Sequence, residues 1–239
     1  MLEVANRPGF SPNACTVAPD RVEIENDYTN SITTGTYAAI VATYPQTLVI
    51  FGTSDPHLDV EIGPLATNHS SAGGRPIDGA SDLELSAKYE LGLHSNVVWG
   101  VEGTVTIPSG APAFTYGNAQ FLGDLNWDYE IDSTYALSGT FSFRAASAVT
   151  PAGTARSYFA FVPSVELIAL LPGHRSQVSA EYAYFSRAGP NLGARSYVDF
   201  AYQRDLGPNL EVEAEYGLAP TLVDGGTERY LEGGLTLLF

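Results

Sequence analysis

Alternation of apolar and polar residues in twelve segments is the feature that most constrains this fold. Each segment has apolar side chains at every second position and mainly polar ones between, the pattern of a β-strand with two unlike faces. Most segments reach the roughly 9–11 residues that a tilted strand needs to cross a bilayer. We expect strands at 21–28, within 35–52, 57–62, 81–91, 96–107, 119–130, 134–146, 155–171, 174–187, 194–206, 210–218 and 228–239.

The connections between these segments alternate in length. Long ones follow the odd-numbered segments, at 29–46, 63–80, 108–118, 147–154, 188–193 and 219–227. Short ones follow the even-numbered segments, at 52–56, 92–95, 131–133, 172–173 and 207–209. This sorting is typical of outer-membrane barrels, and it disfavours a soluble β-sandwich. We therefore predict an all-β, closed antiparallel up-and-down transmembrane barrel of about 12 strands, with the N and C termini in the periplasm.

The last segment is expected to close the barrel. Its residues Leu235, Leu237 and Phe239 share one face, which we expect to meet lipid and to serve closure and assembly. An unpaired sheet edge is excluded from lipid, so this strand should pair with 21–28. We thus divide the chain into an irregular N-terminal segment at 1–19, a periplasmic tail or a plug, and a barrel at 20–239.

Composition agrees with a bacterial outer-membrane location. Charged residues make up 16% of the chain, against about 25% in soluble proteins. The net charge of −16 argues against a nucleic-acid partner. The expected partners are outer-membrane lipid, lipopolysaccharide, the barrel assembly machinery and a small-molecule solute. Residues 1–19 lack the apolar core of a signal peptide, so we expect a mature form, with Cys15 as a thiol in that segment.

Carboxylates dominate the face opposite the apolar one. If the apolar face meets lipid, these acids line a wet lumen, because unpaired charges cannot be held dry. Such a lumen favours cations and neutral solutes over anions. Acids at strand ends, such as Glu90, can instead lie in bulk water. The solute pathway that we predict comprises Glu23, Glu25, Glu84, Lys88, Glu102, Asp124, Arg144, Glu166, Glu181, Asp199, Glu211, Glu213 and Glu232.

Catalytic and metal sites are not expected. The run His94-Ser95-Asn96 has residue types of a hydrolase, but consecutive residues in a turn cannot converge as nucleophile, base and orienting group. No spacing of His, Cys or carboxylates predicts a metal site or a cofactor. A loop calcium site around Asp78 and Asp82 is an open alternative.

Three segments resemble a known family of outer-membrane barrels. They are Arg21-Val22-Glu23-Ile24-Glu25-Asn26-Asp27-Tyr28, Ser81-Asp82-Leu83-Glu84-Leu85-Ser86-Ala87-Lys88-Tyr89 and Val105-Thr106-Ile107-Pro108-Ser109-Gly110. The chain resembles the transporter group named for the MetA pathway of phenol degradation. This resemblance implies a barrel that helps small organic, often aromatic, molecules across the outer membrane.

A passive channel for small organic solutes is the function that we expect. A variant of it is a lateral exit at Pro163, because proline cannot donate a hydrogen bond to the ladder and predicts a bulge or break. Two alternatives are a plugged structural or adhesion barrel without transport and, less favoured, a barrel hydrolase.

Overall fold

The computed structural model describes residues 9–35, 38–72, 75–149, 153–173, 175–220 and 226–239. Thirteen antiparallel strands make up most of this part of the chain. They are β1 Val22–Thr33, β2 Ala39–Gly52, β3 Leu58–Ala72, β4 Arg75–Ala80, β5 Leu83–His94, β6 Val97–Ile107, β7 Gln120–Glu130, β8 Tyr135–Val149, β9 Ala155–Leu170, β10 Ser176–Phe185, β11 Arg195–Gly207, β12 Leu210–Ala219 and β13 Glu228–Leu238. Among the described residues, no helix is long and apolar enough to span a membrane.

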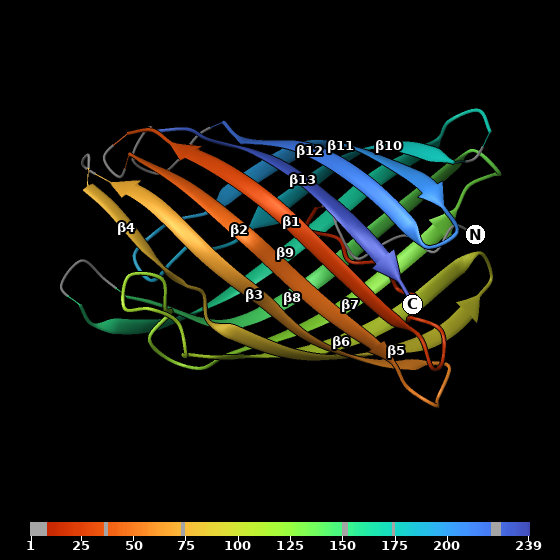
Figure 1. Cartoon of the computed structure of the whole chain (residues 1–239), viewed down its shortest axis with the longest axis horizontal. Helices are drawn as coiled ribbons and strands as arrows, with labels where there is room; N and C mark the ends of the chain where they lie inside the picture. Colours follow the sequence, from red (N-terminus) through yellow and green to blue (C-terminus); the bar gives the residue numbers. More distant parts are fainter. Residues whose placement is uncertain (1–8, 36–37, 73–74, 150–152, 174, 221–225) are drawn as a thin grey trace.

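Twelve of the strands close into a barrel, and β4 is additional (Figure 1). Consecutive strands pair with one another except β4 and β5: β5 pairs with β3 instead, and β1 pairs with β13 over Glu23↔Leu238 to Thr33↔Glu228. Beyond the ladder, Val22 and Phe239 exchange backbone hydrogen bonds of 3.2 and 2.8 Å. The predicted closure of the first strand against the last is therefore confirmed.

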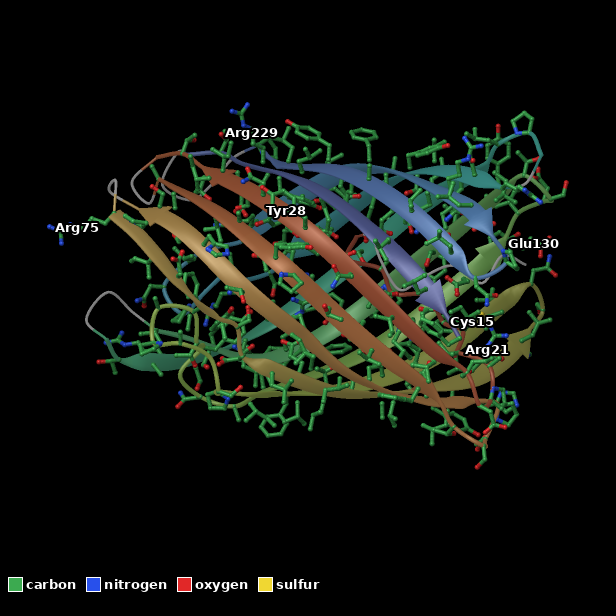
Figure 2. All side chains as sticks on the ribbon, viewed as in Figure 1. Cys15, Arg21, Tyr28, Arg75, Glu130 and Arg229 are labelled. Atoms are coloured by element: carbon green, nitrogen blue, oxygen red, sulfur yellow. The ribbon has the colours of Figure 1, made fainter. Side chains whose placement is uncertain are left out.

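The barrel is apolar outside and polar inside. Large apolar side chains such as Phe159, Phe200 and Leu231 are more than half exposed on the outer surface, whereas most of the buried side chains are polar or charged. This reversal of the soluble pattern is expected of a barrel that lies in lipid. In Figure 2 side chains project outward along the whole wall, with Cys15, Arg21 and Glu130 near one end and Arg75 and Arg229 near the other.

The two ends of the barrel differ. We call the end that carries residues 53–57, 95–96, 131–134 and 208–209 the turn end; residues 9–21 and Phe239 reach it as well. The opposite, loop end carries residues 108–119, 186–194 and the β3–β4 hairpin.

The long first connection predicted at 29–46 is wrong, because β1 runs to Thr33 and β2 starts at Ala39. Residues such as Asn30 and Ser31 lack an apolar rhythm, but paired strands that project into water need none.

The loop predicted at 63–80 is also wrong. β3 continues to Ala72, and β4 pairs back onto it from Thr67↔Ala80 to Ala72↔Arg75. His69 and Asp78 face each other in this hairpin, with His69 Nδ1 2.9 Å from Asp78 Oδ1. In the described part of the chain β4 pairs in the sheet only with β3, so its other edge is available to residues 108–118.

Candidate functional site

The thirteen residues predicted for the solute pathway all lie on the inner face. Residues directly opposite in an antiparallel ladder point to the same side of the sheet. The pairs Lys88↔Glu102, Glu102↔Asp124 and Glu213↔Gly234 extend this common face from strand to strand around the wall. Eleven of the thirteen are acids, and five of these are buried, among them Glu25 at 0% exposure. The inner wall is therefore strongly acidic.

Three acids form one row across neighbouring strands. Glu166 of β9 pairs with Glu181 of β10, and Glu181 pairs with Asp199 of β11. Like charges that lie directly opposite destabilise a sheet unless other groups compensate them. At Glu181 two of the compensating hydrogen bonds come from outside the barrel strands.

Residues 9–18, which we call the plug segment, cross the lumen. The Phe10 backbone N–H donates to Glu181 Oε2 at 2.6 Å, and Ser11 Oγ donates to Glu181 Oε1 at 2.5 Å. Ser11 Oγ also lies 2.7 Å from Ser164 Oγ of β9. The middle acid of the row thus accepts two hydrogen bonds from the plug segment, and one of them satisfies a backbone N–H that has no partner in a strand ladder. Residues 1–8, the rest of the predicted N-terminal segment, lie outside the described residues.

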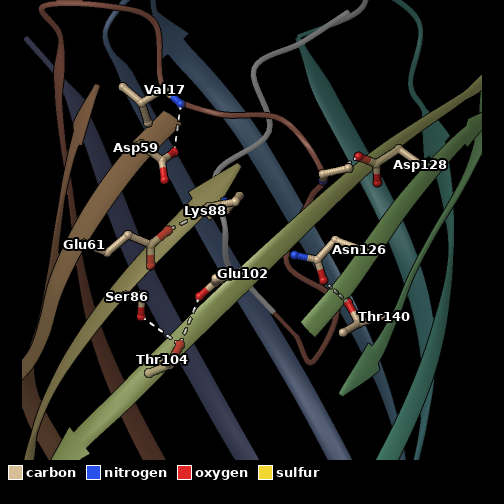
Figure 3. Close-up of polar contacts among 11 residues, drawn as sticks. Val17, Asp59, Glu61, Ser86, Lys88, Glu102, Thr104, Asn126, Asp128 and Thr140 are labelled. Carbon is tan, nitrogen blue, oxygen red and sulfur yellow. Dashed lines mark hydrogen bonds and ion pairs between the residues drawn. The ribbon is translucent and has the colours of Figure 1, made fainter. Parts of the chain in front are cut away.

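Two further acids anchor the plug segment on the other side of the lumen. The Ala14 backbone N–H donates to Asp128 Oδ2 at 2.7 Å, and that of Val17 donates to Asp59 Oδ2 at 3.1 Å (Figure 3). Gly100 leaves room for this approach, because a Cβ there would lie 2.6 Å from the Ala14 carbonyl oxygen. The absence of a side chain at Gly100 therefore lets the plug segment lie directly against the barrel wall.

Lys88 is the basic centre of the turn half of the lumen. Its side chain is 1% exposed, and Nζ lies 3.7 Å from Glu61 Oε1. Glu102, Asp59 and Glu25 also act on it electrostatically, and Figure 3 shows Lys88 between strands that carry Glu61 and Glu102. One ammonium group therefore lies among four carboxylates and offsets part of their negative charge.

An aromatic patch inside the loop half was not predicted as a site. The Phe10 ring packs against Phe185 of β10 and Tyr197 of β11, with ring centroids 5.5 and 5.1 Å apart. Arg144 lies over the Phe185 ring at 5.4 Å, and Arg195 Nη1 donates to Tyr197 Oη at 2.9 Å. Alternation alone places Tyr197 on the same face as Asp199, but no local pattern in the sequence predicts that an irregular segment brings Phe10 onto it.

A cavity of about 890 Å³ lies between the plug segment and the turn end. Its lining includes Ser11, Cys15 and Val17 of the plug segment, Lys88, and residues 131–138. Cys15 thus borders the lumen. A space of this volume is in the range of pockets for small organic molecules, roughly 300–1,000 Å³.

Pro163 lies in a ladder that is continuous on one side. Its pairing with Phe141 of β8 belongs to a register without shifts from Tyr135↔Ala169 to Val149↔Ala155, so the bulge expected there is absent on that side. On the β10 side the ladder ends at Ser164↔Ala183, next to the proline. One backbone hydrogen bond of 2.9 Å, from Ser186 N to Phe161 O, follows beyond it. A lateral exit at Pro163 stays a hypothesis.

Asp82 fastens residues 108–118 to the wall. Its carboxylate accepts from Gly110 N at 2.7 Å, Tyr116 N at 2.8 Å and Thr115 Oγ1 at 3.1 Å. Ala111 N donates to Ala80 O at 2.9 Å, so the same loop covers the free edge of β4. Asp82 and Asp78 thus have separate protein partners, one in this loop and one at His69.

Asp82→Ala is expected to loosen this loop without unfolding the barrel. The change removes three hydrogen bonds to a carboxylate that is 2% exposed, each worth about 1.5–3 kcal/mol when the acceptor is charged. We expect faster amide hydrogen exchange at 109–117, with exchange in β8 and β9 unchanged. Equal protection of the loop in both proteins would contradict its anchoring by Asp82.

No catalytic arrangement is apparent at the sequence run that suggested one. His94 ends β5, and Ser95 and Asn96 form the tight turn before β6, where Ser95 has a φ of 60°. His94 and Ser95 are exposed at the turn end. Side chains at consecutive turn positions point in different directions, and the structure shows no other group joining them at this turn among the described residues.

Comparisons with known proteins place the fold. No family model and no curated protein matches the chain. The COG4313 outer membrane channel from Pseudomonas putida F1 has a TM-score of 0.73 and 12% identity, over 98% of this chain and 99% of that one. The NanC porin has a TM-score of 0.59 and 8% identity, over 89% and 98%. The CymD monoaromatic hydrocarbon channel has a TM-score of 0.50 and 10% identity, over 93% and 89%.

These likenesses establish the fold. The closed 12-strand barrel is one that outer-membrane channels and porins also adopt, as the alternating segments predicted. The resemblance to outer-membrane barrels that the sequence indicated is confirmed for the fold. The chain has the fold of bacterial outer-membrane β-barrel channels.

Proposed function

We propose that this chain is an outer-membrane channel for the passive uptake of small neutral or cationic organic solutes, aromatic ones among them. The observation that carries the proposal is the patch of Phe185 and Tyr197 inside an otherwise acidic lumen, with the ring of Phe10 resting on it. An outer-membrane setting is supported by the apolar outer surface and by the channels and porins that share the fold.

Phe10 marks where an aromatic ring is stabilised within the pathway. Rings at centroid distances of about 4.5–7 Å in tilted or edge-to-face geometry attract one another by about 0.5–1.5 kcal/mol beyond their burial. The Phe10 ring meets both partners in such geometry, with interplanar angles of 82° to Phe185 and 46° to Tyr197. A solute ring of similar size would take the place of Phe10 there.

The charged residues of the lumen would discriminate among solutes that carry an aromatic ring. Eleven acids face the lumen among the thirteen pathway residues, so an anion entering it meets repulsion from the wall. Two of the basic residues, Arg144 and Arg195, lie beside the aromatic patch. The acidic wall disfavours anions, and these two guanidinium groups disfavour cations at the patch, so neutral aromatic solutes are favoured there. The description of CymD as a monoaromatic hydrocarbon channel is in keeping with this solute class.

Phe185→Ala is expected to slow the entry of an aromatic solute, and Phe10→Ala to speed it. The probes are phenylalanine and leucine, which are zwitterions of similar size with and without a ring, in swelling assays on proteoliposomes. Phe185→Ala removes the surface on which the ring rests, whereas Phe10→Ala removes its competitor. We expect the phenylalanine-to-leucine ratio of rates to change in opposite directions in the two variants.

The control for these variants is Phe200→Ala, whose ring is 58% exposed on the outer face of β11. Its ratio should equal that of the wild type. N-acetylphenylalanine, an anion, should enter more slowly than phenylalanine. Equal phenylalanine-to-leucine ratios in all four proteins would refute the aromatic site and leave a general pore.

A structural barrel without transport is the second candidate. It is favoured by the plug segment, which hydrogen bonds to Glu181, Asp128 and Asp59 across the lumen. In planar bilayers a full-length transport channel conducts ions, with cations preferred, whereas a barrel sealed by the plug segment is silent until that segment is removed.

A further inference from the structure

Three carboxylates converge at the seam where the barrel closes. In the ladder, Gly234 of β13 lies directly between Asp27 of β1 and Glu213 of β12. Glu232, two residues earlier on β13, points to the same inner face. One carboxylate oxygen from each of Asp27, Glu213 and Glu232 lies within 4.8 Å of the other two. Three different strands thus contribute oxygen to one place.

Glu213 is the member whose charge lacks compensation. It is 7% exposed, and no described residue donates a hydrogen bond to either of its carboxylate oxygens. The strongest electrostatic influences on it come from other acids: Asp27, Glu25, Glu232 and Glu211. A buried ionised carboxylate without a partner costs several kcal/mol. A cation beside Glu213 would therefore stabilise its carboxylate, and none of the described side chains in hydrogen-bond contact with it supplies one.

Gly234 makes the convergence possible. A Cβ at this position would lie 2.0 Å from Asp27 Oδ1 and 2.7 Å from Glu213 Oε1. The two carboxylates occupy the space that any other side chain would fill. The neighbouring Gly233 differs, since a Cβ there would meet only the Glu213 carbonyl oxygen at 3.7 Å, an ordinary contact.

We propose that Asp27, Glu213 and Glu232 bind a divalent cation of the calcium type, which links β1, β13 and β12 across the closing seam. Calcium takes carboxylate oxygens at about 2.3–2.6 Å in flexible geometry, so ligand oxygens on opposite sides of the ion lie up to about 5 Å apart. The observed separations fit inside this limit. Thr29 Oγ1 donates to Glu232 Oε2 at 2.6 Å and orients that ligand. The cation would satisfy Glu213 and tie the first strand to the last two.

Calcium binding to purified protein in detergent tests the proposal. The probe is calcium chloride, titrated by isothermal calorimetry after dialysis against a chelator, with thermal unfolding measured in parallel. Wild-type protein should bind calcium saturably and unfold at a higher temperature with calcium, because a ligand of the folded state stabilises it. Gly234→Ala and Glu213→Gln should each weaken binding by at least an order of magnitude.

Gly233→Ala is the matched control, because it adds the same methyl group one residue away on the opposite face of β13. It should bind calcium as the wild type does. Gly234→Ala could lose calcium binding because it folds poorly. Glu213→Gln controls for this, since it removes one charge without adding a heavy atom to the site. No saturable calcium binding to the wild type, or binding to Glu213→Gln equal to that of the wild type, would overturn the proposal.

Discussion

A variant that begins at Pro19 should conduct ions several-fold better than the full chain. The plug segment crosses the lumen between Glu181, Asp128 and Asp59, and its removal leaves the wall intact because the ladder begins at Val22. The acids that it releases would then be hydrated. Single-channel recordings in planar bilayers measure the change. The current should be cation-selective, as shown by the reversal potential in a salt gradient.

Glu181→Gln provides an intermediate case in the full-length chain. It keeps one oxygen that can accept from Phe10 N or Ser11 Oγ and removes the charge that strengthens both bonds, a loss of about 1–2 kcal/mol. We expect more frequent openings than in the wild type and fewer than in the variant that begins at Pro19. If the truncated and full-length proteins conduct equally, the plug segment does not obstruct the pathway.

Lys88→Met should destabilise the barrel more than any other single substitution discussed here. It removes the ammonium group beside Glu61, Glu102 and Asp59 and leaves buried carboxylates without it. Breaking a buried ion pair from one side costs about 3–5 kcal/mol. The measurement is the urea midpoint in detergent, followed by fluorescence of Trp99 and Trp127, with an unchanged slope as the sign of a stability effect.

A double variant tests the reason for that loss. Lys88→Met with Glu61→Gln should recover part of it, because one orphaned charge is removed with its partner. Arg195→Met, which breaks the less buried pair with Glu228 at 2.9 Å, should cost less. A midpoint for Lys88→Met equal to that of the wild type would mean that water or protons already neutralise the surrounding acids.

Alternation made the architecture predictable. The face of Glu25 or Glu213 follows from a period of two residues, a local property that needs no knowledge of neighbouring strands. The closure of β1 on β13 followed from the rule that lipid excludes open edges. Strand ends at the loop side were predicted less well. There, Asn30 and His69 lie in paired strands without an apolar face, so periodicity carries no signal.

The candidate site was harder to predict from the sequence, because it depends on contacts between residues far apart in the chain. The plug segment has no period, and its register against Glu181, Asp128 and Asp59 depends on strands that are far apart in the chain. The same holds for the carboxylates at Gly234. Asp27 and Glu213 are 186 positions apart (213 − 27), and only the register of the seam brings them to one glycine. The expectation of no metal site rested on sequence spacing alone, which cannot detect ligands gathered in this way.

The acidic inner wall makes the lumen a compartment of fixed charge. Twelve strands spaced about 4.8 Å apart and tilted about 40° enclose a cylinder roughly 24 Å across between backbones. At about 0.01 M salt the Debye length is about 30 Å, so fields from opposite walls overlap and mobile anions are excluded as in an ion-exchange resin. At about 1 M it shrinks to about 3 Å, and anions share the passage. Permeation should therefore depend on the salinity of the habitat as well as on the solute.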